Sequence, residues 1–402
     1  MKTQNWHSEQ NWIYSAKFDG FFIIAPAFII TFAALLFADK LDALSQVSPL
    51  WFGLLIVGID VSHVYSTIFR TYCDKDELRA RKTLYTLTPL LCWFCGTLLY
   101  AASDLIFWRA ITYLAVFHFV RQQYGFMMIY RRKNNINTLG AKLPHPTPLP
   151  LGEGSYGKAV TGEGINKFLD KAAIYIATIY PLIYWHTNLP RNFDWFIEGD
   201  FVAIPYQFIN IAGLCLYIAI IALYIGKEAY LSFKTGNLNI AKNLLLLGTG
   251  LSWWVGIVYF NNDLAFTAIN VVAHGIPYIA LIWIYGHNQS KLSPRKIMLG
   301  RITWQKFFSP RYLGLFLGVI LALAWFEEGL WDALVWSEHK NFFRALHALP
   351  NIDDKATLTW LIPLLALPQT THYVLDAFIW RMQTKGTNWK HILFLKQQLK
   401  PN

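Results

Sequence analysis

The chain has 402 residues, of which 55% are hydrophobic, 17% aromatic and only 15% charged. Because soluble domains carry about 25% charged residues, this composition excludes an ordinary soluble protein and predicts an all-α polytopic membrane protein. The net charge of +11 does not predict a nucleic-acid partner, since the lysines and arginines lie between apolar runs rather than along one basic face.

Ten apolar segments are long enough to cross a bilayer as helices. In chain order they are residues 19–38, 50–70, 83–101, 104–130, 167–187, 205–226, 241–261, 264–286, 312–337 and 357–381. They predict a single integral-membrane helical domain over residues 1–402, built as a bundle of about ten transmembrane helices.

The basic residues alternate between the two predicted ends of these spans. Connections that follow even-numbered spans are rich in lysine and arginine, as at residues 70–82, 131–133 and 291–311. Connections that follow odd-numbered spans hold few basic residues. The positive-inside rule therefore places both termini on the cytoplasmic side of the membrane, N-in and C-in.

Two stretches are expected to lie outside the bundle, on its cytoplasmic side. Residues 134–166 contain the run PHPTPLPLGEGSYGKAVTGEG, which is too rich in Pro and Gly to build a core and predicts a flexible loop. Its repeated GEG units are typical of a translated repetitive element of bacterial genomes. The loop is therefore interpreted as an insertion, and the protein is expected in the inner membrane of a bacterial cell. Residues 386–402 predict a basic amphipathic tail that lies on the membrane surface.

Four predicted spans each carry one histidine, at similar depths from the outer end: His63, His118, His274 and His372. All four spans are even-numbered and so run in the same direction. Neutral imidazoles that converge from neighbouring helices are typical of a transition-metal site. We expect the four histidines to be metal ligands, for iron in the first place and otherwise for copper, zinc or manganese. A haem held by two of them is a further alternative, and purely structural hydrogen bonding between helices is another.

Four charged residues near these histidines are expected to be catalytic. Asp60 precedes His63 by three residues and Asp376 follows His372 by four, so each carboxylate shares a helix face with an imidazole that it can orient. Glu327, followed by Glu328, reaches a similar depth from the opposite direction. Arg121 lies one turn from His118, where we expect it to face a polar cavity and hold an anionic group.

These residues predict an intramembrane metal-dependent enzyme of the oxidoreductase type, acting on a lipid-like or other hydrophobic substrate. The expected partners are membrane lipids, a hydrophobic small molecule and a soluble redox protein that docks on the basic cytoplasmic connections. Two alternatives stay open: a proton- or ion-coupled transporter that uses the same residues as a relay, and a metal-free lipid transferase with a histidine as general base. The chain lacks the HxxxH and HxxHH boxes of membrane desaturases, so no family is assigned.

Overall fold

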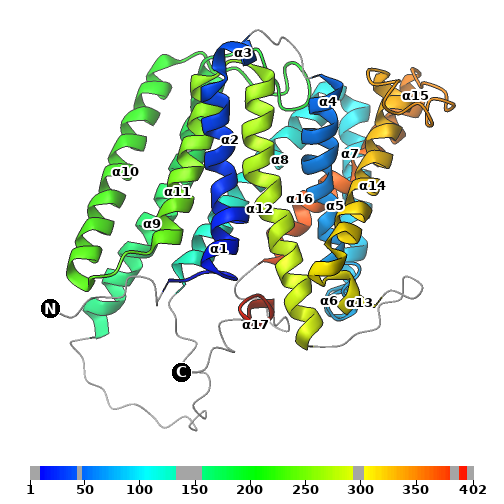
Figure 1. The fold of residues 1–402 in the computed structure, drawn as a ribbon. Helices are drawn as coiled ribbons and strands as arrows, with labels where there is room; N and C mark the ends of the chain where they lie inside the picture. The colour runs from blue at the N-terminus through cyan, green and yellow to red at the C-terminus, as the bar shows by residue number, and fades with distance from the viewer. Residues whose placement is uncertain (1–9, 43–47, 133–155, 293–302, 381–388, 396–402) are drawn as a thin grey trace.

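The computed structural model describes residues 10–42, 48–132, 156–292, 303–380 and 389–395 (Figure 1). Within these ranges the chain is helical and forms no strand. The all-α prediction is therefore confirmed for the described residues.

Helical segments occupy each of the ten predicted positions. In chain order they are α1 (Ala16–Asp19) with η1 (Gly20–Ile24) and α2 (Ala25–Leu36); α4 (Pro49–Trp51) with η2 (Phe52–Val61), α5 (Ser62–Ser66) and η3 (Thr67–Phe69); α7 (Lys82–Ala102); α8 (Asp104–Arg131); α9 (Tyr156–Thr187); α10 (Gln207–Thr235); α11 (Ile240–Trp253) with η5 (Trp254–Tyr259); α12 (Asp263–Leu292); η6 (Pro310–Tyr312) with α14 (Leu313–Trp331) and η7 (Asp332–Trp336); and α15 (Lys355–Leu365) with α16 (Leu367–Ile379). The shorter helices are α3 (Ala38–Asp42), α6 (Lys75–Ala80), α13 (Trp304–Phe307) and α17 (Trp389–Leu393).

By length and composition, seven helices of the described chain are apolar enough to cross a membrane. They are Ala16–Leu36, Pro49–Phe69, Lys82–Ala102, Gln207–Thr235, Ile240–Tyr259, Asp263–Leu292 and Pro310–Trp336. The other three predicted spans are helical but do not qualify. α8 carries several charged side chains, α9 begins in a polar segment, and the last span is divided at Ala366. The described residues thus form a helical bundle suited to a membrane.

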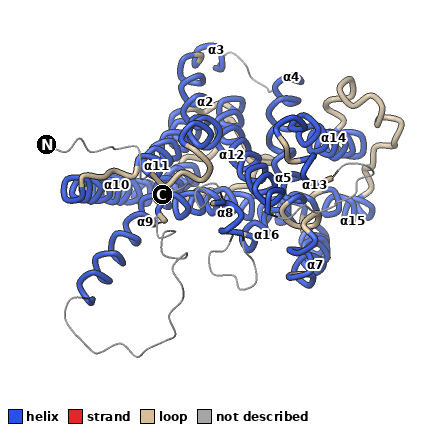
Figure 2. Tube along the Cα trace, turned by 60° about the horizontal axis from the view of Figure 1, so that its bottom comes forward, coloured by secondary structure: helices blue, strands red, loops and turns tan. Residues whose placement is uncertain are grey.

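The described chain begins and ends on the same side of the bundle. α1 and α17 lie at one end, which we call the α17 end, whereas α3, α4 and α15 lie at the opposite end, the α3 end (Figure 1). The four helices α5, α8, α12 and α16, which carry the predicted ligands, lie close to one another in the interior (Figure 2). Any site that these helices build is therefore enclosed by the bundle.

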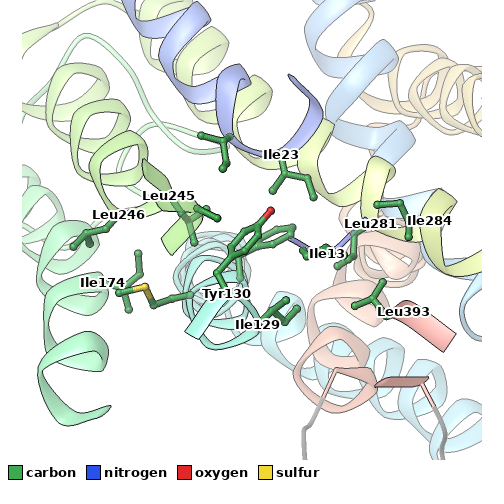
Figure 3. Packing of buried hydrophobic residues seen from close by; sticks show 14 of the residues in the cluster. Ile13, Ile23, Ile129, Tyr130, Ile174, Leu245, Leu246, Leu281, Ile284 and Leu393 are labelled. Carbon is green, nitrogen blue, oxygen red and sulfur yellow. The ribbon is translucent and has the colours of Figure 1, made fainter. Parts of the chain in front are cut away.

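The largest apolar cluster fills the α17 end. Tyr130 of α8 lies at its centre, between Ile23 and Leu245 on one side and Ile129 on the other (Figure 3). The cluster also contains Leu393 of α17.

Part of the predicted C-terminal tail, α17, packs against the bundle. Trp389 and Leu393 are 2% and 0% exposed, so α17 packs against the α17 end of the bundle, and its position relative to a membrane surface stays a prediction. The physical reason is that the apolar face of α17 fits between helix ends, where Asn288 Nδ2 also donates to the Leu393 carbonyl at 3.0 Å. The remaining residues of the predicted tail, 386–388 and 396–402, lie outside the described residues.

The predicted loop 134–166 lies only partly within the described residues. Residues 134–155 are outside them, whereas residues 156–166 form the first turns of α9. No proline follows Pro150 in this loop, so nothing prevents the helix from extending beyond its apolar part.

Two irregular helices border the histidine-bearing region. η2 is a π-helix of ten residues that ends two residues before His63. Such π-helical stretches are rare and occur frequently at functional sites. α15 ends at Leu365 and α16 begins at Leu367, between Pro363 and Pro368. Both irregularities directly precede a segment that carries a histidine of the site, α5 and α16.

Candidate metal centre

The four predicted ligands meet in the interior of the bundle. His63 lies on α5, His118 on α8, His274 on α12 and His372 on α16. Their side chains are buried, with exposures of 1%, 1%, 1% and 2% respectively. We call these four residues the histidine cluster. The sequence predicted that they share one layer, and the structure brings them into direct contact.

The Nε2 atoms of the cluster form a chain of close contacts. His274 Nε2 lies 3.2 Å from His63 Nε2 and 3.1 Å from His118 Nε2. His118 Nε2 lies 3.1 Å from His372 Nε2. His63, His118 and His372 each offer one ring nitrogen to a group whose members lie within 4.8 Å of one another. Among the described residues, this group of histidines is the one whose geometry suits a metal ion.

These nitrogen contacts cannot all be good hydrogen bonds. A ring nitrogen of a neutral imidazole carries either one hydrogen or one lone pair. His118 Nε2 has two Nε2 neighbours and so has His274 Nε2, which leaves at least one poorly satisfied contact in the chain of nitrogens. A cation between the rings would accept a lone pair from each of them. Nitrogens about 2.0 to 2.1 Å from a tetrahedral ion stand about 3.3 Å apart, close to the observed spacing.

The opposite ring nitrogens face polar groups. Asp376 Oδ2 lies 3.4 Å from His118 Nδ1, and Asp60 Oδ1 lies 3.5 Å from His63 Nδ1. His372 Nδ1 lies 2.7 Å from Thr67 Oγ1. A metal-bound histidine usually presents its other nitrogen to such a carboxylate or hydroxyl, which fixes the ring orientation.

His274 is held by packing and through its backbone. Its ring stacks on Phe119, with ring centroids 3.6 Å apart and planes 7° from parallel. Gln122 Nε2 donates to the His274 carbonyl at 2.9 Å. His274 Nδ1 has no hydrogen-bond partner among the described residues. The ring is thus fixed without a carboxylate.

Two polar residues of this site were missed by the sequence analysis. Tyr278 OH donates to Asp376 Oδ1 at 2.9 Å and lies 3.0 Å from Thr67 Oγ1. Asp376 is therefore connected to His118 directly and to His372 through Tyr278 and Thr67. A signal was available: Thr67, Gln122, Tyr278 and Asp376 each follow one histidine by four residues, which places them on the same helix face.

Glu327 does not join the ring nitrogens. It is 4% exposed, lies on α14, and its nearest charged and polar neighbours include Asp60 and Tyr65. The structure therefore places Glu327 in a layer beside Asp60, next to the histidine cluster. The side chain of Asp60 is 31% exposed, more than any member of the cluster.

Arg121 points away from the histidine cluster. Its Nη1 donates to Tyr175 OH of α9 at 2.9 Å, and its guanidinium lies 4.8 Å from the centroid of the Tyr124 ring. We expected Arg121 to share a polar cavity with His118, but its side chain is surrounded by tyrosines instead. The physical reason is that its long side chain reaches two tyrosines on the α9 side of α8, where it gains a hydrogen bond and ring stacking.

A cavity of about 270 Å³ reaches the cluster from the side. It lies between η3, α7 and α16, and His372 and Thr67 form part of its wall. The other lining residues are mainly apolar, including Ile68, Leu364 and Leu375. The cavity could therefore accept an apolar molecule.

No family model, curated protein or solved structure matches the chain.

Proposed function

We propose that this protein is an intramembrane metal-dependent enzyme of the oxidoreductase type that acts on a lipid-like substrate. The histidine cluster would hold the metal ion. The observation that carries the proposal is the group of ring nitrogens from His63, His118 and His372 within 4.8 Å of one another, with His274 Nε2 3.1 to 3.2 Å from two of these histidines. Three of the Nδ1 atoms face Asp376, Asp60 and Thr67. Histidines that only form hydrogen bonds between helices are not expected to bring their ring nitrogens together in this way.

Imidazole ligands suit iron, copper, zinc and manganese, and iron is the first choice for an oxidoreductase. Haem fits less well. The contacting Nε2 atoms of the cluster lie 3.1 to 3.2 Å apart, which leaves no space for a flat macrocycle between those rings.

The chain's own residues would position the ion and handle protons. Asp376 and Asp60 would orient His118 and His63 and increase their basicity as ligands. Asp60 is also the more exposed of the two acids near the cluster, so it is the group best placed to exchange a proton. A bound transition metal would supply activation of oxygen or water in a site from which bulk water is excluded.

A hydrophobic substrate is supported by the apolar cavity that ends at His372. Membrane lipids surround the protein in this proposal, and a soluble redox partner would dock on the basic connections of the α17 end. We propose ten membrane crossings with both termini in the cytoplasm, in the inner membrane of a bacterium. The ten helical segments and the alternation of basic residues support that topology.

The test is the metal content of the detergent-purified protein, measured by elemental analysis together with its absorption spectrum. We expect close to one equivalent of a transition metal, and a loss of most of it in each single alanine variant of the histidine cluster. His287→Ala is the matched control, because His287 lies on α12 but contacts Phe308 at the α17 end. Normal metal content in all four cluster variants would overturn the proposal.

The same preparation separates the two alternatives. A transporter would drive proton or ion flux in sealed vesicles and would not depend on a tightly bound transition metal. A metal-free transferase would keep its activity after treatment with chelators. Metal-free protein that also fails to take up iron, copper, zinc or manganese on reconstitution would exclude the metalloenzyme.

A further inference from the structure

The cavity beside the histidine cluster runs from the lipid-facing surface to a buried floor. Tyr72 and Leu364 line its rim and are 37% and 48% exposed. His372, Thr371 and Leu375 line it deeper inside and are 2%, 8% and 1% exposed. The lining therefore changes from exposed to buried along one path through the side of the bundle.

A break in the last helical segment forms one wall of this path. Ala366 separates α15 from α16, and Pro368 and Leu367 line the cavity directly after it. Irregular backbone at membrane depth is tolerated where it is buried in protein or lines a cavity. The break therefore belongs to the construction of the cavity.

The deep part of the cavity holds an unused polar group. Thr371 Oγ1 has no nitrogen or oxygen partner among the described residues. Its polar neighbour is the Cys92 thiol, and a thiol forms only weak hydrogen bonds. Neighbouring Thr71 is different, because its hydroxyl donates to the Thr67 carbonyl at 2.8 Å. A buried hydroxyl without a partner is costly, and a ligand oxygen at this position would satisfy it.

We propose that this cavity binds one hydrocarbon chain of a membrane-borne substrate, which enters between α7 and α16 and carries a hydroxyl or carbonyl oxygen that Thr371 recognises. The inference rests on the proposed function, since it names the class of substrate for the same site. A hydrocarbon chain is favoured by the mainly apolar lining of this cavity of about 270 Å³, which runs from exposed to buried residues. The exposed leucines Leu87, Leu90 and Leu91 of α7 place the entrance in the apolar belt of the protein.

The position of His372 connects this cavity to the metal ligands. His372 Nδ1 contacts Thr67, which lines the cavity with it, whereas its Nε2 contacts His118 on the other side of the ring. One imidazole ring therefore separates the bound chain from the proposed ion. A substrate oxygen near Thr371 would be separated from the metal centre by a single side chain, that of His372.

The probe for this inference is a twelve-carbon alcohol with a photoreactive group at its far end, applied to the full-length protein in vesicles. We expect labelling to concentrate in the peptides around residues 64–72 and 364–375. Unlabelled dodecanol should compete better than dodecane by roughly fivefold, the size of effect that one hydrogen bond gives. Thr371→Val should remove that preference. Thr370→Val is the matched control, because the hydroxyl of Thr370 is already bonded to the Ala366 carbonyl at 3.0 Å.

A second variant tests the cavity by filling it. Leu367→Trp should reduce specific labelling severalfold, whereas Leu247→Trp on the lipid-facing side of α11 should not. Labelling spread evenly over α10 and α11 as well, or unchanged by Leu367→Trp, would overturn the inference. Metal content is measured on the same samples. Specific labelling of protein that binds no metal would support the chain-binding cavity and contradict the metalloenzyme. Unspecific labelling of protein that does bind metal would support the metalloenzyme and contradict the cavity.

Discussion

Asp376 Oδ2 lies 3.4 Å from His118 Nδ1, although the two residues come from helices that are far apart in the sequence. The second oxygen of the same carboxylate accepts a hydrogen bond from Tyr278, which in turn contacts Thr67. One buried acid therefore connects groups on η3, α8 and α12. Such a connection would fix the relative orientation of several ligands before an ion arrives.

Asp376→Asn should weaken metal binding without unfolding the protein. The amide keeps the size of the side chain but removes the charge that orients His118. Removal of such an outer partner typically costs about 10- to 100-fold in metal affinity. The measurement is a titration of bound metal against a competing chelator. Asp353→Asn in an exposed loop is the control, and equal affinities for the two variants would contradict the orienting role.

Gly275→Ala should disturb the site through the backbone. A Cβ atom at Gly275 would lie 2.6 Å from Ile59 Cγ2 and 3.2 Å from the Ile59 carbonyl oxygen, so α12 and η2 would have to separate. His274 directly precedes Gly275 and His63 lies one turn after Ile59, so we expect the two imidazoles to move apart. We expect a loss of about 1 to 3 kcal/mol of stability together with weaker metal binding.

The control for this glycine is Gly318→Ala on α14. A Cβ there meets nothing within 4 Å, so the substitution should be neutral or slightly stabilising because alanine favours the helix. Thermal unfolding of both variants, followed with and without metal, provides the comparison. A tolerated alanine at Gly275 would show that the close approach of α12 and η2 is unimportant for the site.

The sequence was sufficient to predict the positions of the helices, because each is a long apolar run. It also predicted the histidine layer, because four parallel helices carry a histidine at similar depth. It was insufficient to predict contacts where the direction of a side chain depends on its neighbours. Arg121 lies one turn from His118, yet its side chain reaches Tyr175 on α9. The contact of Tyr278 with Asp376 joins α12 to α16, and no local spacing encodes it. The apolar face of α17 likewise depends on which helix ends surround it.

The proposed topology predicts opposite accessibility for the two ends of the bundle. Asn351 lies in the connection before α15, at the α3 end, and Lys75 lies at the start of α6, at the α17 end (Figure 1). In a variant without the four native cysteines, Asn351→Cys should react with a membrane-impermeant maleimide added to intact cells. Lys75→Cys should react only after the membrane is permeabilised. The reverse pattern would invert the orientation.

Asp194, in the connection between α9 and α10, should make stability depend on pH. Burial, with help from the charges of Asp200, Glu198 and Asp263, raises the pKa of Asp194 from 3.8 to about 6. The folded protein thus holds this proton more tightly than the unfolded chain. The stabilising effect is complete below pH 3.8 and is lost as the pH rises through about 6.

Asp194→Asn, which imitates the protonated acid, should therefore be more stable than the natural protein at pH 7.5. We expect a gain of about 1 kcal/mol, because Asp194 is only half-buried and solvent screens its neighbours. The difference in melting temperature should shrink as the pH is lowered towards 4. A gain that stays constant over this range would show that the charge of Asp194 is not its source.

Removal of the metal should destabilise the whole bundle, since the ion would connect α5, α8, α12 and α16. A ligand present at about a thousand times its dissociation constant adds roughly 4 kcal/mol to the stability of the state that binds it. Chelation should therefore lower the melting temperature of the natural protein, and addition of the same metal should restore it. In His372→Ala neither treatment should have an effect, whereas His287→Ala should respond like the natural protein. A chelator effect of equal size in His372→Ala would mean that the stabilising ion binds somewhere other than the histidine cluster.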